Sequence, residues 1–291
     1  MSKVLYLILL KPLSLLPHGI LYRISDVLYF ILYFLVGYRK KVVAQNLLRA
    51  FPTKSIKERQ QIARNFYQHL CDIIVESVKT FTITHKEGQK RFRLKNPEAL
   101  ENYFENHKSA ICFSAHYCNW EMAGTSIASF VHHTPIAIYK SINNAFLNDK
   151  MLETRSSKGS VLINKSVFKK QFDDYVQKQI PVIAFFLSDQ SPNTKNAYWV
   201  PFFNIETAFA FGGEAYARKY DLPVFYGKIT KPRRGHYEAE FILLAETLSD
   251  KPNGWAVEAF SRALETQIKE EPALWLWSHK RWKKSRDDYK R

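Results

Sequence analysis

Short apolar runs recur from about residue 108 onward, separated by polar or amphipathic stretches. Runs of this kind are typical of buried strands in a mostly parallel sheet, because both faces of each strand are covered. A fifth run, HYEAEFILL (236–244), partly alternates between apolar and polar positions and predicts a more exposed strand. The other four apolar runs are AICFS (110–114), PIAIYK (135–140), PVIAFFLS (181–188) and PVFYGKIT (223–230).

Amphipathic helical patterns lie between and after these runs. SVFKKQFDDYVQKQ (166–179) separates two of them, and PNGWAVEAFSRALETQIKEE (252–271) follows the last. Strands that alternate with helices indicate an α/β fold. We therefore predict a mostly parallel central sheet flanked by helices.

Residues 42–80 predict two helices in succession. The first, VVAQNLLRAF (42–51), has helical spacing and is ended by Pro52. Ser55 and Glu58 then have the spacing of a capping box, which begins a helix. Apolar residues follow at helical steps and indicate one face packed on the body. They are Ile62, Phe66, Leu70, Ile73 and Ile74.

The N-terminus is apolar but repeatedly interrupted. Its longest stretch without a charge, residues 27–38, is short against the ~20 residues that a membrane-spanning helix needs. No small-residue cleavage site follows the first apolar stretch, which argues against a removed signal peptide. The interruptions are Lys11, Pro12, Pro17, Arg23 and Asp26.

We therefore expect residues 1–41 to form a membrane-associated helical hairpin, and residues 42–291 to form the α/β domain. Two alternatives stay open: a single membrane span over residues 18–38, and a buried helical pair of a soluble domain. Three cations, RKK (39–41), follow the apolar segment directly. Their position favours a cytoplasmic membrane face.

Charge adds a second constraint. The 291 residues are 46% hydrophobic and carry a formal net charge of +16, which predicts a folded protein with an anionic partner such as nucleic acid, phospholipid headgroups or an acidic protein. Nucleic acid is disfavoured, because the sequence has no zinc-finger, RNA-recognition or helix-turn-helix pattern. Cys71, Cys112 and Cys118 are too few for a disulfide framework and indicate a reducing compartment.

Candidate chemistry follows the first apolar run, in FSAHYCNWEMAG (113–124). His116 is expected in the turn at the carboxyl edge of the sheet, where open α/β sheets bind their ligands. Asn119 is a suitable N-cap for the next helix, which places Glu121 in the first helical turn. From there Glu121 is expected to reach one imidazole nitrogen of His116. The pair would form a general base suited to a hydroxyl that attacks an acyl carbonyl.

The same residues allow other interpretations. The histidine and the carboxylate can form an ordinary structural hydrogen bond. Cys112, His116 and Cys118 suggest a metal site, although no second Cys/His cluster completes it. Cys118 beside His116 can also be a nucleophile.

A resemblance to a known family now enters. SAHYCNWEMAG resembles the H-x-x-x-x-[DE] signature of the glycerolipid acyltransferase superfamily, and in particular the bacterial lipid A biosynthesis (late) acyltransferases. Blocks similar to those of the family follow one another in order over nearly the whole chain. They are residues 41–76, IAIYKSINNAFLNDKMLETRSSKG (136–159), the D-Q-x-P region with the segment after it (186–224) and LWLWSHKRWK (274–283).

The resemblance implies transfer of a fatty acyl chain from a thioester, carried by acyl carrier protein or coenzyme A, to a hydroxyl of a membrane lipid. It favours secondary acylation of a lipid A precursor, with a lysophospholipid, aminolipid or glycolipid as the alternative acceptor. His116 would deprotonate the acceptor, and Glu121 would orient the imidazole. No cofactor and no metal is implied. A non-catalytic membrane scaffold is the competing class, and it does not explain the ordered blocks.

Further residues gain expected roles from the resemblance. Lys140, Arg155 or backbone N–H groups near Asn119 would support the oxyanion, and Arg155 would alternatively bind a phosphate. Lys140 stands where many family members have arginine, and lysine lacks the planar two-pronged donor. Asp189 and Gln190 end a predicted strand on the same sheet edge. Their expected role is acceptor binding or support of the active-site loop, with a strand-end cap as the alternative.

The C-terminal segment mixes tryptophans with cations. Such mixtures belong at a headgroup interface or against an acidic carrier protein, and the alternative is a solvated basic tail packed by its tryptophans. The implied location is the cytoplasmic face of the inner membrane, where a basic rim would attract both an acidic carrier and a phosphate-bearing lipid.

Overall fold

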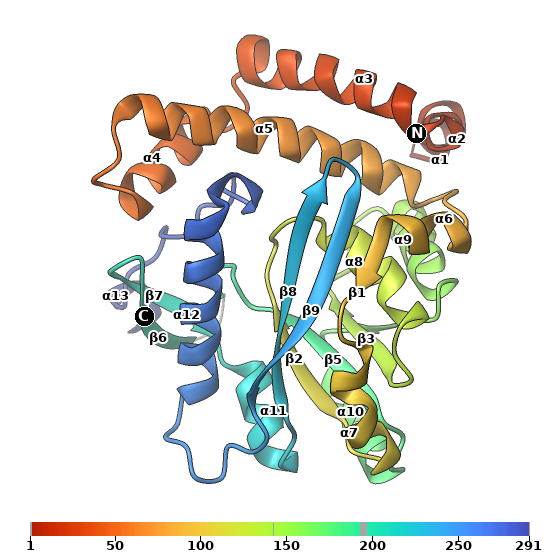
Figure 1. Cartoon of the computed structure of the whole chain (residues 1–291), viewed down its shortest axis with the longest axis vertical. Coiled ribbons are helices and arrows are strands. Elements are labelled where there is room, and N and C mark those ends of the chain that lie inside the picture. The colour runs from red at the N-terminus through yellow and green to blue at the C-terminus, as the bar shows by residue number, and fades with distance from the viewer. Residues whose placement is uncertain (1, 142, 193–196, 291) are drawn as a thin grey trace.

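The structure is a computed structural model, and it describes residues 2–141, 143–192 and 197–290. Residues 142 and 193–196 belong to two of the blocks that carry the resemblance and lie outside the described residues. The sheet and its flanking helices form the body of the protein, and long helices lie across one end of it (Figure 1).

A seven-stranded sheet forms the centre, in the order β1-β9-β8-β2-β5-β3-β4. All neighbouring strands are parallel except β8 and β9, so β1 and β9 run opposite to the other five. The predicted α/β class with a mostly parallel sheet is confirmed. The strands are β1 (Phe92–Leu94), β2 (Ala110–Ser114), β3 (Thr134–Tyr139), β4 (Val161–Asn164), β5 (Val182–Leu187), β8 (Val224–Arg233) and β9 (His236–Ala245).

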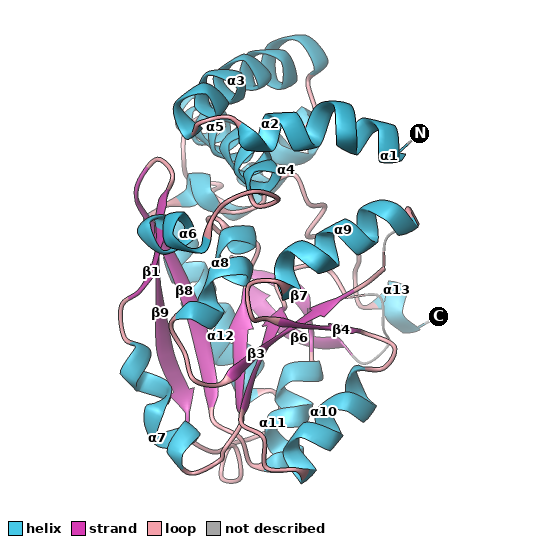
Figure 2. Ribbon diagram, turned by 90° about the vertical axis from the view of Figure 1, so that its right-hand side faces the viewer, coloured by secondary structure: helices cyan, strands magenta, loops and turns pink. Residues whose placement is uncertain are grey.

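A separate antiparallel hairpin, β6 (Ala197–Phe202) with β7 (Ile205–Ala210), stands beside this sheet. Helices pack on both sides of the main sheet (Figure 2). The helices of the body are α6 (His85–Arg91), α7 (Glu101–Glu105), α8 (Trp120–Ser126), α9 (Ala145–Ser156), α10 (Phe168–Gln177), α11 (Gly212–Tyr220), α12 (Trp255–Glu270) and α13 (Asp287–Lys290), with short 3₁₀ turns at η3 (Pro97–Leu100), η4 (Ile127–Ser129) and η5 (Pro272–Leu274).

The register of two central strands brings their ends together. Strand β2 is buried along its whole length between β5 and β8. Ser114 at its end pairs with Leu187 at the end of β5, and the Ser188 N–H donates to the Ser114 carbonyl over 3.0 Å. Because the two strands are parallel, residues just beyond them meet at one edge.

The two helices predicted over residues 42–80 are present as α4 (Lys40–Ala50) and α5 (Ile56–Lys79). The capping box is confirmed: the Glu58 N–H donates to Ser55 Oγ over 3.2 Å, and the Ser55 N–H donates to Glu58 Oε2 over 2.7 Å. Ile74 was expected on the buried face and is 39% exposed. Polar side chains share the buried face of α5 instead, namely His69, Asp72 and Glu76.

Two helical segments precede this pair and lie outermost. The first comprises α1 (Ser2–Leu5), the π-helical turn η1 (Tyr6–Leu10) and α2 (Lys11–Leu15). The second comprises α3 (His18–Phe30) and its π-helical extension η2 (Ile31–Val36). Residues His18–Val36 have the length and apolar composition of a membrane-crossing helix, and 17% of the window is buried. In Figure 1, α3 runs alongside α5, and the first segment points in another direction.

Candidate active site

His116 lies two residues beyond β2, and Asp189 lies two residues beyond β5. The pairing of these strands places the two side chains together, and His116 Nδ1 is 2.7 Å from Asp189 Oδ1. The sequence suggested Glu121 as the partner of the imidazole, and the structure assigns this hydrogen bond to Asp189. The expected contact was wrong because register across a sheet decided it, rather than spacing along the chain.

Asp189 is held from two sides. Its side chain is 2% exposed, and Oδ2 accepts the indole N–H of Trp275 over 2.9 Å. With Oδ1 accepting the Nδ1 proton of His116, the neutral ring keeps its lone pair on Nε2. The hydrogen bond thereby selects the tautomer that can take a proton.

The contact between His116 and Asp189 shifts the pKa of both groups. Burial disfavours the imidazolium, but the charge and hydrogen bond of Asp189, helped by the charge of Glu121, raise the pKa of His116 above its usual value. Burial likewise opposes ionisation of Asp189, and its interactions with His116 and Trp275 outweigh this and lower its pKa. Asp189 is therefore a carboxylate poised to stabilise a protonated His116.

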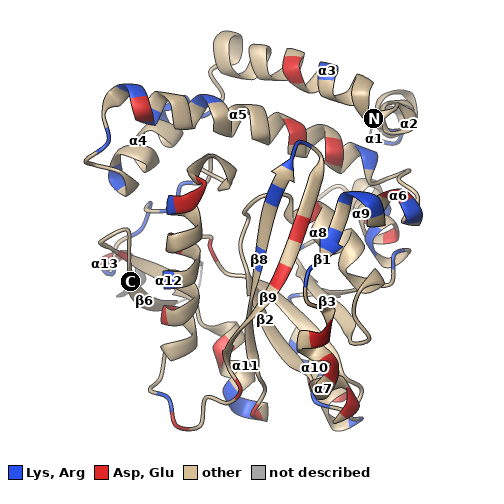
Figure 3. Cartoon of the chain, viewed as in Figure 1, with Lys and Arg blue, Asp and Glu red and all other residues tan. Residues whose placement is uncertain are grey.

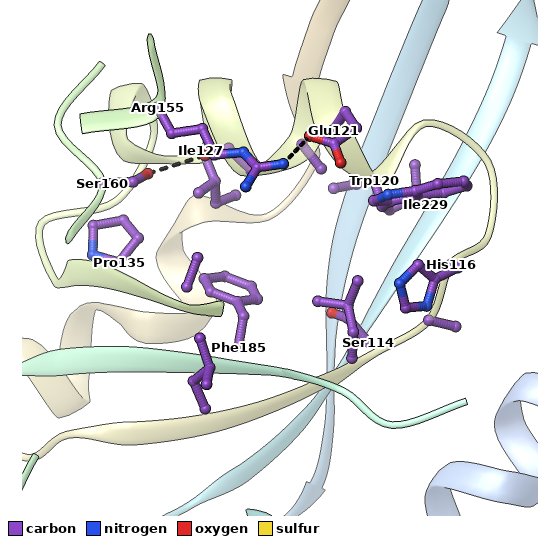
Figure 4. Close-up of a pocket in the computed structure, with 18 of the residues that line it drawn as sticks. Ser114, His116, Trp120, Glu121, Ile127, Pro135, Arg155, Ser160, Phe185 and Ile229 are labelled. Carbon is purple, nitrogen blue, oxygen red and sulfur yellow. Dashed lines mark hydrogen bonds and ion pairs between the residues drawn. The ribbon is translucent and has the colours of Figure 1, made fainter. Parts of the chain in front are cut away.

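Glu121 faces the same space with a different partner. It lies in the first turn of α8, as predicted, because Asn119 caps this helix by accepting the Met122 N–H over 2.9 Å. Its Oε2 accepts from Nη2 of Arg155 on α9 over 2.5 Å (Figure 4). Their side chains are 26% and 22% exposed. Glu121 thus anchors a cation on the wall of the pocket.

The pocket joins these groups to an apolar interior. Its volume is about 300 Å³, and its wall includes His116, Trp120, Glu121 and Arg155. Figure 4 shows these polar groups around one side of the cavity and Phe185 and Pro135 toward the other. The ring of Trp120 packs edge-on to His116, with centroids 5.2 Å apart. The apolar part is lined by Phe92, Ile127, Pro135, Ala137, Leu162, Phe185 and Phe241, among others.

The remaining predicted site residues are distributed unevenly. Lys140 is exposed and lines the pocket, as Arg155 does. Gln190 is half-buried in the bend after Asp189 and is not part of the pocket wall. For Asn119, support of substrate or the oxyanion by backbone N–H groups at the start of α8 stays a prediction; the side chain itself is 1% exposed. Its amide donates to Glu76 and its oxygen accepts Met122 N–H, so its side chain supports the helix instead.

The cysteine alternatives are unfavourable. Cys112 and Cys118 are both fully buried. Burial raises the pKa of the Cys112 thiol to about 12 and raises that of Cys118 further, so neither is a ready nucleophile. Over the described ranges, no group of three or more His, Cys, Asp and Glu side chains is arranged to hold a metal ion.

The tryptophans and the cations of the C-terminal segment differ in their burial. Trp275 and Trp277 are buried, so they do not lie at a headgroup surface, and the interpretation as a basic segment packed by its tryptophans holds for them. Lys280 and Lys283 are exposed, whereas Arg281 is buried and donates to the Ala208 carbonyl over 2.7 Å. The Arg39 and Arg49 guanidinium groups donate to the carbonyls of Ser278 and Trp282.

This contact joins two stretches without acidic residues, 27–57 and 272–286. Together they form an exposed cationic surface, to which we refer as the basic surface; Figure 3 marks Lys and Arg residues along α4 in blue. The same C-terminal segment contacts the end of β5, since the Ser191 N–H donates to His279 Nε2 over 3.2 Å. The basic surface consists of Arg39, Lys41, Arg49, Lys280 and Lys283.

Two supporting residues escaped sequence reasoning. Trp275 orients Asp189 from 86 positions away in the chain, and Trp120 packs on His116. The resemblance flagged the C-terminal block that contains Trp275, but nothing local in the sequence connected it with Asp189.

Comparison with known proteins identifies a family that the chain resembles. A sequence model of the family described as "Bacterial lipid A biosynthesis acyltransferase" matches residues 1–284. The lipid A biosynthesis palmitoleoyltransferase of Escherichia coli (strain K12) is 20% identical over 253 residues, covering 84% of this chain and 79% of that protein. The lipid A biosynthesis acyltransferase of Haemophilus influenzae is 21% identical over 258 residues, covering 87% and 80%.

Proposed function

The chain belongs to the bacterial lipid A biosynthesis acyltransferase family, and we propose that it carries out a secondary O-acylation of a lipid A precursor. The acyl chain comes from a thioester and the acceptor is a hydroxyl group. One observation carries the proposal: an imidazole held by a buried carboxylate at the side of an apolar cavity.

The proposed reaction begins with proton transfer. His116 Nε2 takes the proton of the acceptor hydroxyl while the oxygen attacks the thioester carbonyl. Asp189 stabilises the resulting imidazolium through Nδ1. The tetrahedral intermediate then collapses, the carbon–sulfur bond breaks, and the leaving thiolate takes the proton back from Nε2. The products are an ester and a free thiol, and no covalent acyl-enzyme is needed.

Two cations are placed to stabilise charge in this reaction. Glu121 holds Arg155 at the pocket wall, and Lys140 lies at the end of β3 on the same wall. We propose that they stabilise the developing oxyanion or bind a phosphate of one substrate. Glu121 then acts by positioning Arg155 and by adding negative potential near His116. Gln190, next to Asp189, supports the loop rather than the reacting atoms.

The acyl chain occupies the apolar part of the cavity. Its wall there is aliphatic and aromatic, so methylene groups of the chain gain about 0.8 kcal/mol each on leaving water. The thioester end then lies toward His116, because the polar groups line one side of the space (Figure 4). Exclusion of water also protects the thioester from hydrolysis.

We assign acyl carrier protein as the donor in preference to coenzyme A. The basic surface matches a strongly acidic carrier, and the C-terminal segment links it to the end of β5, where Asp189 lies. Opposite charges speed such encounters at low ionic strength. Acyl coenzyme A remains the alternative donor, and competition between the two thioesters distinguishes them.

The location that we propose is the cytoplasmic face of the inner membrane, with α3 lying in the plane of the interface. Its polar face is bonded to the body: Ser25 Oγ donates to Asp72 over 2.7 Å, and Arg234 forms an ion pair with Asp26 at 2.6 Å. A transverse span would break these contacts. Apart from the exposed Arg23, whose long side chain can reach the headgroups, its outer face is apolar and suits the acyl region of one leaflet. Exposed along α3 and its extension η2 are Ile20, Val27, Phe30, Ile31, Phe34, Leu35 and Val36.

Mass spectrometry of lipids from cells with and without the gene tests the function. We expect lipid A lacking one secondary acyl chain in the deletion, restored by the wild-type gene and not by His116→Ala. Unchanged lipid A with altered phospholipids, aminolipids or glycolipids would overturn the lipid A assignment and identify another acceptor.

A further inference from the structure

A buried carboxylate outside the pocket ties three distant segments together. Glu76 on α5 is 1% exposed. Its Oε1 accepts the hydroxyl of Tyr22 over 2.7 Å, and its Oε2 accepts the hydroxyl of Tyr237 and the amide of Asn119, each over 2.6 Å. All three donors are neutral groups. Among the described residues Glu76 forms no ion pair, although the charge of Lys231 acts on it. A buried carboxyl without an ion pair costs free energy, so a carboxyl in this place calls for a role beyond packing.

One of these donors leads to the active site. Asn119 caps α8, and α8 carries Glu121. The same α5 also reaches the turn before the cap: His69 Nε2 is 3.3 Å from the Cys118 carbonyl. Cys118 has φ +58°, a left-handed conformation that residues other than glycine adopt at a cost. The turn from His116 to Asn119 therefore depends on contacts with α5.

Another donor leads to the surface. Tyr22 belongs to α3, whose opposite face exposes the apolar side chains proposed to enter the membrane. The hydroxyl of Tyr22 and the amide of Asn119 meet on one carboxylate, although 97 positions separate them in the sequence. A displacement of α3 relative to α5 alters the hydrogen bonds of Glu76 and, through Asn119, the start of α8.

We propose that Glu76 is a positioning residue. It couples the packing of α3 against α5 to the geometry of the turn from His116 to Asn119, through Tyr22 on one side and Asn119 on the other. The inference rests on the proposed function for its effect on turnover, but its structural core does not. It assigns α3 a second role besides membrane attachment: when α3 is packed against α5, it holds α8, and with it Glu121, in the reactive arrangement.

Two conservative substitutions test the coupling. Tyr22→Phe removes a single hydroxyl, and Glu76→Gln keeps the shape but replaces one acceptor oxygen by an N–H donor that faces other donors. Tyr29→Phe is the matched control, because Tyr29 lies on the same helix and packs its ring on Tyr33. Hydrogen exchange of the peptide covering residues 115–126 is measured with and without vesicles of anionic phospholipid, together with kcat and KM for the thioester.

We expect Tyr22→Phe to speed exchange in residues 115–126 about 3-fold or more and to lower kcat by a similar factor, with KM and vesicle binding unchanged. Glu76→Gln should speed exchange and lower kcat by larger factors than Tyr22→Phe. In the double variant Tyr22→Phe should add little, because both substitutions act through one carboxylate. Vesicles should slow exchange in this peptide in the wild type and not in Tyr22→Phe. Tyr29→Phe should match the wild type throughout.

Other outcomes overturn the proposal. Unchanged exchange in residues 115–126 in both variants would show that Glu76 does not hold the turn. Equal acceleration over the whole protein would show that the contacts serve general stability alone. If the wild type transfers no acyl chain to lipid A precursors while the exchange pattern follows expectation, the proposed function fails and the coupling stands.

Discussion

Two carboxylates, Asp189 and Glu121, influence His116 and differ in almost every physical respect. Asp189 is 2% exposed and accepts from an imidazole and an indole. Glu121 is 26% exposed and is paired with a guanidinium. The buried group is the one in contact with the imidazole, whereas the signature spacing in the sequence points to the more exposed group, Glu121. Environment, rather than proximity along the chain, decides which carboxylate tunes the base.

The difference also has an energetic side. The Glu121–Arg155 pair is partly buried, but water still reaches it and screens both charges, so it contributes about 1 kcal/mol to folding. Breaking a buried pair by removing one member costs more, since the other is left without its partner. We therefore expect changes at Asp189 to affect both chemistry and stability, and changes at Glu121 to affect mainly the reaction.

The largest effect on activity is expected for His116, the imidazole that both carboxylates influence. His116→Ala removes the general base and should lower kcat by about 10³–10⁴-fold, with the fold intact. Single-turnover acyl transfer with purified protein measures this, and circular dichroism controls for folding. Retention of more than a tenth of the activity would exclude His116 as the base.

Asp189→Asn should come next. The asparagine keeps the volume but neither stabilises the imidazolium nor enforces its tautomer, so kcat should fall about 10²–10³-fold. Gln190→Ala, one residue further and outside the pocket wall, is the matched control and should cost far less. An Asp189→Asn variant with near-normal kcat would reverse the comparison between the two carboxylates.

Glu121→Gln should have a smaller effect, about 10-fold, because it releases Arg155 without removing the partner of the imidazole. Arg155→Ala should produce a similar loss, and the double variant should lose little more than either alone. Additive losses would mean that Glu121 and Arg155 act independently, contrary to the ion pair between them.

The smallest expected effect is on stability. The raised pKa of His116 contributes stability that is lost as pH rises through that pKa, and the lowered pKa of Asp189 contributes stability that is lost as pH falls through it. The joint contribution is therefore complete between roughly pH 4 and 6.5, the unfolded values. Thermal unfolding should show Asp189→Asn about 1–2 kcal/mol less stable near pH 5.5, with a smaller gap near pH 9. A gap that grows with pH would contradict this sign.

Much of the fold follows from the sequence because its signals are local. The five apolar runs, the capping box at Ser55 and the N-cap at Asn119 are all present where they were predicted. Strands β1 and β4 were missed, because three and four residues are too few for a periodic signal. The hairpin β6–β7 was missed because Phe203 and Asn204 form its tight turn at positive φ, and phenylalanine gives no turn signal.

The same sequence reasoning predicted only part of the site. Sequence placed His116, Glu121 and Asp189 at one edge of the sheet, since each follows a recognisable strand. Which carboxylate meets the imidazole depends on the pairing of Ser114 with Leu187, and strand register is not written in either strand alone. The same holds for Trp275 and Glu76, whose contacts join segments far apart in the chain.

The most direct measurement is an NMR titration of the His116 imidazole in the wild type, Asp189→Asn and Glu121→Gln. We predict a wild-type pKa above the usual value of about 6.5, a large decrease in Asp189→Asn, where burial is no longer opposed, and a small decrease in Glu121→Gln. A large decrease in Glu121→Gln with no change in Asp189→Asn would show that Glu121 is the partner of the base after all.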